Sequence, residues 1–249
     1  MPGMTKMLTV GVKGIRRLFT KGPVDTARWT WYHIYERYRE WSLGIKTNDC
    51  EAWVDFFGDS DHHVYEPLCY ACIDRALSSL TIRPGQDAFL DYGSGQGRIV
   101  TVAATYPFDR VIGIDMVPEL NDIAEANIRR AQSKLKCKNV ELHTDDATQY
   151  TVPPDVTVIF LFNPFRGDVL RAVQQQMHRS VQQTPRKLTI IYINPREDPN
   201  LFSECDWLVP VRKIPTGRWD TMRFLVYETH PSVETSTAGL GRESESVGV

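Results

Sequence analysis

The stretch Phe89-Leu-Asp-Tyr-Gly-Ser-Gly-Gln-Gly-Arg98 joins an apolar run to an apolar helical pattern that begins at Ile99. The run ends in a carboxylate, and three glycines then follow at every second position. This order predicts a strand, a tight turn and a helix, because glycine adopts positive φ and lets a ligand approach the backbone. A carboxylate at the end of the strand suits a cationic ligand group better than a phosphate. The stretch therefore predicts a nucleoside-cofactor site.

Strand and helix patterns alternate around this turn. Further strands are predicted at residues 111–115, 140–144, 156–162, 188–193, 207–214 and 222–229, and helices at residues 68–80, 99–106, 118–135 and 169–181. Only a turn separates the last two strands, which indicates an antiparallel hairpin. The alternation before them predicts an α/β fold with a mostly parallel, seven-stranded sheet covered by helices on both faces.

Composition is that of an ordinary globular protein, with 249 residues, 42% hydrophobic and 24% charged. The formal net charge of -2 gives no electrostatic case for a nucleic-acid partner. No apolar run approaches the roughly 18 residues of a membrane span. The oligomeric state is not indicated.

Five scattered cysteines, an odd number, favour free thiols and a cytoplasmic location. The group His62, His63, Cys69 and Cys72 is spaced too closely for a usual zinc finger, so no metal site is predicted.

The N-terminal part carries a basic segment and then an aromatic helix. Residues 1–24 contain five basic residues and no acid, and we interpret them as a mobile or peripherally packed segment. Residues 26–43 predict a helix with one apolar face, formed by Trp31, Ile34, Tyr35, Tyr38 and Trp41. This stripe is expected to pack on the main domain, or else to line a substrate pocket as a lid.

Three regions follow from these patterns. Residues 1–63 are predicted to form the basic segment and helical extension, and residues 64–230 the main domain. Residues 231–249 contain almost no apolar side chain and are predicted to be disordered.

Polar residues stand at the carboxyl ends of four predicted strands, where open parallel sheets bind ligands: Asp91, Asp115, Asp146 and Asn163. Asp115 follows the second strand, where dinucleotide folds place the acid that binds ribose hydroxyls. A dehydrogenase is therefore an alternative. Against it, the glycines are spaced G-x-G-x-G and Asp91 would repel a pyrophosphate. A sulfonium cofactor with an amino-acid tail has the opposite need, because its ammonium is attracted to a carboxylate.

Residues 64–229 resemble a class I, seven-stranded, Rossmann-like S-adenosylmethionine-dependent methyltransferase. The matching motifs are the turn from Asp91 to Gly97, the acid Asp115 and the pair Asp146-Ala147. Residues 89–98, 106–115, 127–130 and 162–165, with Tyr65-Glu66-Pro67, also resemble a group of mostly uncharacterised bacterial methyltransferases.

The resemblance implies roles for individual residues. Asp91 would hold the ammonium of S-adenosyl-L-methionine, the glycines would line its methionine and ribose parts, and Asp115 would bind the ribose. Met116 would pack on the adenine, and Asp146 would accept from its exocyclic amine. The full set of expected cofactor-binding residues is Asp91, Gly93, Ser94, Gly95, Gly97, Asp115, Met116, Asp146, Ala147 and Asn163.

The acceptor side is less determined. Asn163-Pro164-Phe165 resembles the Asn/Asp-Pro-Pro-aromatic motif of methyltransferases that act on nitrogen, but one proline is missing. A nitrogen acceptor, an oxygen or other small-molecule centre, and a purely structural strand cap all stay open. Asn163 and Tyr65 are the candidate catalytic residues. The expected acceptor is a small molecule or a protein side chain; the alternatives are a protein-lysine methyltransferase of the seven-strand type and a SAM-binding protein without catalysis.

Overall fold

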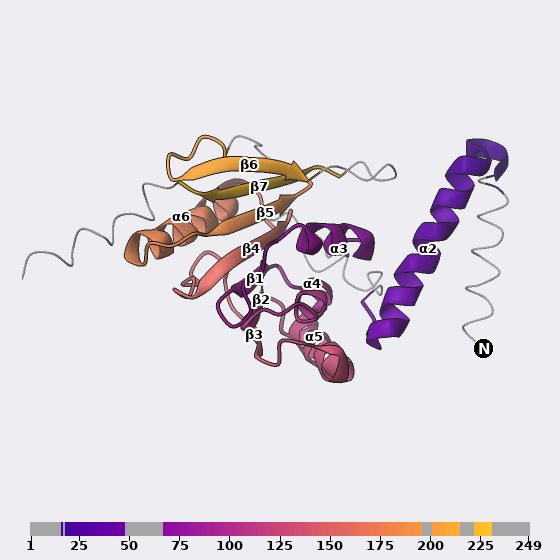
Figure 1. Cartoon of the computed structure of the whole chain (residues 1–249), viewed down its shortest axis with the longest axis horizontal. Helices are drawn as coiled ribbons and strands as arrows, with labels where there is room; N and C mark the ends of the chain where they lie inside the picture. Colours follow the sequence, from indigo (N-terminus) through magenta and orange to yellow (C-terminus); the bar gives the residue numbers. More distant parts are fainter. Residues whose placement is uncertain (1–15, 17, 48–66, 196–200, 215–221, 231–249) are drawn as a thin grey trace, which may run out of the picture.

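A seven-stranded sheet forms the centre of the computed structural model, which describes residues 16, 18–47, 67–195, 201–214 and 222–230 (Figure 1). The strand order is β3-β2-β1-β4-β5-β7-β6. The strands are β1 (Ala88–Tyr92), β2 (Arg110–Asp115), β3 (Val140–Thr144), β4 (Val156–Phe162), β5 (Thr189–Ile193), β6 (Leu208–Ile214) and β7 (Phe224–Thr229). Strands β1 to β5 pair in parallel, and β7 pairs antiparallel with both β5 and β6. The predicted mostly parallel sheet with an antiparallel C-terminal hairpin is confirmed.

Helices cover both faces of this sheet. They are α3 (Tyr70–Ser78), α4 (Arg98–Ala103), α5 (Pro118–Ala131) and α6 (Gly167–Gln183), preceded by the N-terminal α2 (Pro23–Leu43). Alternate side chains of a strand point to opposite faces. Thus Phe89 of β1 belongs to the core that contains Ile73 of α3, whereas Leu90 belongs to the core that contains Val173 of α6.

The strand order reverses direction between β1 and β4. The chain runs from β1 outward through β2 to β3, and then returns to the other side of β1 with β4. Open α/β sheets bind ligands at such a switch point, beyond the carboxyl ends of the strands. The glycine turn after β1 and Asn163 after β4 both stand there.

The apolar face predicted for α2 is mostly exposed and does not pack on the main domain as expected. Trp31, Ile34, Tyr38 and Trp41 are exposed, and only Tyr35 of the five packs against the core. The opposite, more polar face of α2 contacts the domain instead, because Glu36 and Glu40 of that face have a buried cationic partner in α4.

A disulfide joins Cys69 and Cys72, whereas the sequence had favoured free thiols. The two residues are three apart, and their Cα atoms lie 5.4 Å apart because Cys69 caps α3 and Cys72 lies in its first turn. That separation is within the usual range for a disulfide. Cys137 and Cys205 are free thiols.

Some predictions concern residues outside the described part of the chain: the basic residues 1–15, the candidate catalytic residue Tyr65, the histidines His62 and His63, and the C-terminal residues 231–249. Within the described ranges, no helix is both long enough and apolar enough to cross a membrane.

Candidate active site

The turn between β1 and α4 depends on its glycines for two reasons. Gly93, Gly95 and Gly97 have φ values of 75°, 53° and 77°, in the left-handed region that favours glycine. A Cβ on Gly93 would lie 2.9 Å from the Cβ of Pro164, and one on Gly97 would lie 2.8 Å from the Cβ of Ala124. The turn is therefore packed tightly between the loop after β4 and helix α5.

Asp115, at the end of β2, holds the turn through its carboxylate. Its Oδ2 accepts from the N–H of Gly95 at 2.8 Å, and its Oδ1 accepts from the N–H of Val117 at 3.0 Å. The N–H groups of Gly93 and Ser94 both donate to the carbonyl of Ile114 at 2.9 Å. These bonds fix the orientation of the Asp115 carboxylate beside the glycine turn.

Asp91 is a buried acid with unused hydrogen-bonding capacity. It lies in β1 with only 1% of its surface exposed, and neither carboxylate oxygen has a hydrogen-bond partner among the described residues. Burial, and secondarily the charge of Asp115, raises the pKa of Asp91 well above its ordinary value. A buried carboxylate without partners is costly, and a bound cation would compensate it. The primary ammonium of an amino-acid-tailed cofactor has the matching charge.

Ser94 is also buried, and its hydroxyl has no hydrogen-bond partner within the described ranges. Ser94 lies in the glycine turn, three residues after Asp91 of β1. Buried polar groups with unmet hydrogen bonds are a feature of a site built for a polar ligand.

The loop after β3 lies next to Asp115. The N–H of Asp145 donates to the carbonyl of Asp115 at 3.2 Å. Asp146 is exposed, and its Oδ1 accepts from the N–H and the hydroxyl of Thr148, both at 2.8 Å. Ala147 is buried, and Met116, directly after Asp115, leaves 47% of its surface exposed. Met116 and Asp146 therefore lie just beyond the carboxyl ends of β2 and β3. The sequence predicts that the adenine binds there.

Asn163 has a left-handed backbone at the end of β4. Its φ is 47°, although it is not glycine, and its side chain is buried. Such conformations cost free energy and concentrate at functional sites. The following Pro164 lies against Gly93, and Phe165 contacts the ring of Tyr92 edge-on at 6.1 Å between centroids. Asn163 is thus brought to the same edge of the sheet as the glycine turn.

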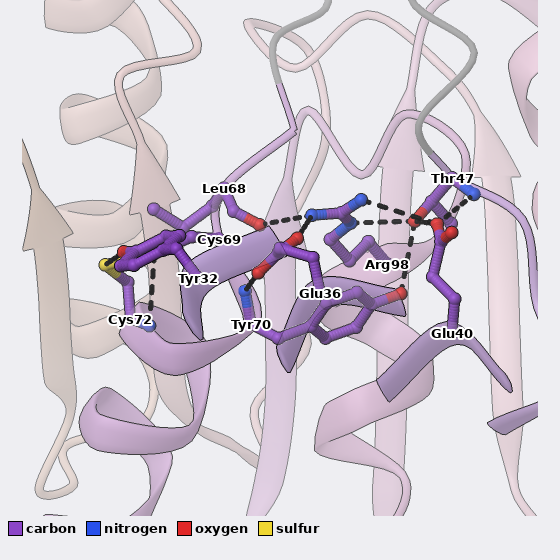
Figure 2. A network of polar contacts seen from close by, with 9 residues as sticks. All are labelled: Tyr32, Glu36, Glu40, Thr47, Leu68, Cys69, Tyr70, Cys72 and Arg98. Atoms are coloured by element: carbon purple, nitrogen blue, oxygen red, sulfur yellow. Dashed lines mark hydrogen bonds and ion pairs between the residues drawn. A yellow bond between two sulfur atoms is a disulfide. The ribbon is translucent and has the colours of Figure 1, made fainter. Parts of the chain in front are cut away.

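Arg98, the first residue of α4, was given no role from the sequence but forms the centre of a buried network (Figure 2). Its Nη1 donates to Glu36 Oε2 at 2.9 Å and to the carbonyl of Leu68 at 2.8 Å, and its Nε donates to Thr47 Oγ1 at 2.7 Å. Glu40 completes the group as a second ion-pair partner at 3.6 Å. A cation at a helix N-terminus opposes the helix dipole, and this was the available signal that Arg98 has acidic partners.

Tyr70 joins the same network from α3. Its backbone N–H donates to Glu36 Oε1 at 2.7 Å, and its ring lies under the Arg98 guanidinium at 4.3 Å from centroid to Cζ. Burial raises the pKa of Glu36, and the charge of Arg98 partly offsets that rise. Helix α2 is therefore fastened to the residue that directly follows the glycine turn.

Asn127 of α5 makes a second link of this kind. Its side-chain amide donates to the carbonyls of Gln96, in the turn, and of Lys46, after α2, at 3.0 and 2.9 Å. Its carbonyl oxygen accepts from the N–H of Lys46 at 3.0 Å. Asn127 is fully buried. A buried asparagine in an amphipathic helix was the sequence signal for such a role.

Comparisons with known proteins agree with this geometry. Residues 89–184 match the model of a methyltransferase domain family. A magnesium protoporphyrin IX methyltransferase from Synechocystis with bound S-adenosylhomocysteine superposes with a TM-score of 0.50 and 12% identity, over 64% of this chain and 82% of that one. An uncharacterised protein from Listeria monocytogenes superposes with a TM-score of 0.50 and 11% identity, over 66% and 69% of the two chains.

An RNA methyltransferase from Salinibacter ruber, in complex with S-adenosylhomocysteine, has 23% identity and a TM-score of 0.47, over 66% of this chain and 92% of that one. No match was found among curated protein sequences. The domain match, the sheet order and the cofactor-type turn agree with one another. Residues 89–184 therefore form a methyltransferase domain, a family whose cofactor is S-adenosylmethionine, and the sheet has the Rossmann-like order of the class I fold.

Proposed function

We propose that this methyltransferase transfers the methyl group to a nitrogen of a small molecule or of a protein side chain. The observation that carries the proposal is Asn163, a buried amide in a left-handed backbone at the switch point of the sheet. An amide oxygen held there can accept a hydrogen bond from the N–H of the substrate nitrogen. That bond orients the nitrogen lone pair toward the methyl group. A cytoplasmic location, and the division into residues 1–63, 64–230 and 231–249, stay predictions.

The same proposal assigns the cofactor contacts. Asp91 would bind the ammonium, because its buried carboxylate lacks other partners among the described residues. Asp115 would bind the ribose hydroxyls beside Gly95, to whose N–H it is already hydrogen-bonded. Met116 and Asp146 would contact the adenine. Gly93, Ser94, Gly97 and Ala147 complete the cofactor-binding set.

Bound S-adenosylmethionine supplies an electrophilic methyl group on a sulfonium. The chain's own contribution is position: the turn held by Asp115 fixes the donor, and Asn163 fixes the acceptor at the neighbouring strand end. Alignment of two reacting groups can supply a large part of a rate acceleration. A dedicated base is not required, and no described side chain is assigned that role.

The acceptor class can be tested by labelled-methyl transfer from S-adenosylmethionine to fractionated lysate, with small-molecule, protein and RNA pools incubated separately. Label is expected in the small-molecule or protein pool, on a nitrogen. Label confined to RNA, or on oxygen, contradicts the proposal.

The role of Asn163 can be tested in the same assay with Asn163→Gly, which removes the amide but tolerates the left-handed φ. Transfer is expected to fall about 100-fold, as for a misplaced acceptor. Asn194→Gly is the matched control, because Asn194 follows β5 with a φ of 52° and no proposed role. Equal transfer by both variants would show that Asn163 is only a strand cap.

A further inference from the structure

Exposed large apolar side chains are concentrated on one segment of the molecule. Seven of the nine such residues in the described ranges lie between positions 18 and 41. They are Leu18, Phe19, Val24, Trp31, Ile34, Tyr38 and Trp41. The remaining two are single residues elsewhere, and a concentration of exposed apolar side chains on one segment is typical of an interaction site.

Five of these side chains form one face of α2, here called the aromatic stripe: Val24, Trp31, Ile34, Tyr38 and Trp41. Their spacing of seven, three, four and three residues keeps them on one side of a helix. Within the stripe, Trp41 leaves 78% of its surface exposed. Figure 1 shows α2 as a rod at the edge of the molecule, beside α3.

The aromatic stripe is not available to the domain, because other side chains of α2 hold the helix in place. Tyr35 Oη and Arg39 Nη2 both donate to Asp74 of α3 at 2.7 Å. Glu36 and Glu40 contact the buried Arg98. A rotation of α2 that buried the stripe would break these polar contacts, so the stripe stays directed away from the domain.

The charges around the aromatic stripe are mainly basic. Arg28 and Arg37 lie on its two sides, as helical spacing requires. Arg16 and Lys21 precede the helix in the described part of the chain. The two glutamates of the helix face Arg98, and its single aspartate, Asp25, lies in the first turn.

We propose that α2 binds an anionic lipid surface, with the aromatic stripe in the interfacial region of the bilayer and the basic residues at the lipid headgroups. Trp and Tyr favour this region because one end of each ring system is apolar and the other polar. A helix with such a stripe and basic flanks lies in the plane of the interface. Each basic residue near the surface adds attraction to anionic lipid.

A second copy of the chain fits the surface less well. Two stripes packed face to face would bring the flanking arginines of both copies together, with like charges opposed. RNA also fits less well, because Ile34 interrupts the aromatic residues, and neither Ile34 nor Val24 offers a ring for base stacking.

Sedimentation of the full chain with vesicles tests the proposal. Binding to mixed phosphatidylglycerol–phosphatidylcholine vesicles is expected, with much weaker binding to phosphatidylcholine alone and a loss as salt is raised. The double variant Trp31→Ser with Trp41→Ser should reduce partitioning at least tenfold. The matched control is Val211→Ser, an exposed apolar residue of β6 outside the stripe, which should bind as the unaltered chain does.

Titration of each variant with S-adenosylmethionine shows that folding is intact, because the stripe lies outside the cofactor site. Any of these outcomes overturns the proposal: no binding of the unaltered chain to anionic vesicles, equal binding by the double variant, or a concentration-dependent dimer that the double variant abolishes without any lipid binding. Retention of RNA in place of vesicles would also overturn it.

Discussion

Asp91 is expected to lower the stability of the protein without its cofactor and to favour binding of the cofactor. Its carboxylate is buried and lacks hydrogen-bond partners among the described residues. Its pKa is raised by burial and by Asp115, so the native state retains a proton that the unfolded chain has lost. Stability of the empty protein should therefore fall as pH rises from about 3.9, the unfolded pKa, through the raised native pKa.

Asp91→Asn should remove this fall, because the amide does not ionise. At neutral pH the empty variant should be more stable, and a gain of about 1 kcal/mol raises Tm by roughly 2–4 °C. Affinity for S-adenosylmethionine should fall at least tenfold, since the ammonium loses its counter-charge. Thermal unfolding across pH and calorimetric titration measure the two effects.

Asp87 provides the contrasting control, because it is a buried acid whose partners are present. Burial alone would raise its pKa, but the hydrogen bonds from Arg83 and Thr157 outweigh burial and lower it. Asp87→Asn should therefore destabilise the protein above the ordinary Asp pKa. If both variants shift stability in the same direction, Asp91 does not lie in a cation-binding site.

Asp115→Ala should weaken S-adenosylmethionine binding at least tenfold, about 1.4 kcal/mol, because the ribose loses charge-assisted hydrogen bonds. The Gly95 N–H also loses its acceptor, which loosens the turn. Calorimetric titration gives the affinity, and circular dichroism shows whether the fold persists. Unchanged affinity in a folded variant would mean that the cofactor lies elsewhere.

Gly97→Ala tests the turn by its packing as well as by its backbone angle. The new Cβ would lie 2.8 Å from that of Ala124, and φ would stay at 77°. We expect a loss of about 2–4 kcal/mol in the free energy of unfolding from strain plus overpacking. Gly85→Ala separates the two, because Gly85 has a φ of 71° but open space around it, and should lose only about 1 kcal/mol. Urea denaturation gives both values, and equal losses would argue against tight packing at Gly97.

At the scale of elements, α2 is attached through charge. The side chain of Arg98 is 4% exposed and that of its partner Glu36 is 15% exposed. Removal of one partner of a buried pair leaves an uncompensated charge. This attachment joins α2, α3 and the N-terminus of α4.

Arg98→Ala should destabilise the protein by about 3–5 kcal/mol, the usual cost of breaking a buried ion pair. Amide exchange should also increase in α2, which loses its link to α4. Arg129→Ala is the control, because its pair with Glu125 is exposed and worth less than about 1 kcal/mol. Denaturation and hydrogen exchange measure these effects, and unchanged exchange in α2 would refute the role of Arg98.

The elements differ in how far the sequence predicts them. The bounds of β3 and β4 agree with the prediction, because apolar and β-branched runs between turn signals are local patterns. The predicted orientation of α2 was wrong, because the apolar face of a helix is usually the buried one and in α2 it is mostly exposed. Its buried face depends on Arg98, a partner 62 positions from Glu36, which no periodicity reveals.

For the whole molecule, the residues at the carboxyl edge of the sheet could be predicted from the sequence. The contacts that hold the neighbouring helices and loops in place could not. Asp91, Asp115 and Asn163 were located because parallel strands bring their ends to one edge. Arg98, Asn127 and the Cys69–Cys72 disulfide were missed, because each depends on how separate elements meet. The roles of the predicted cofactor residues stay predictions until the variants are measured.

The place of β7 between β5 and β6 has a consequence for synthesis on the ribosome. Strand β5 is fully buried in the finished sheet, yet its neighbour β7 is translated after β6. At a translation rate of roughly 5–20 residues per second, one edge of β5 stays unpaired for a few seconds before β7 has been synthesised. An unpaired apolar edge can join another nascent chain during that interval. The sheet therefore has a period of exposure to aggregation that ends only when translation has passed Thr229.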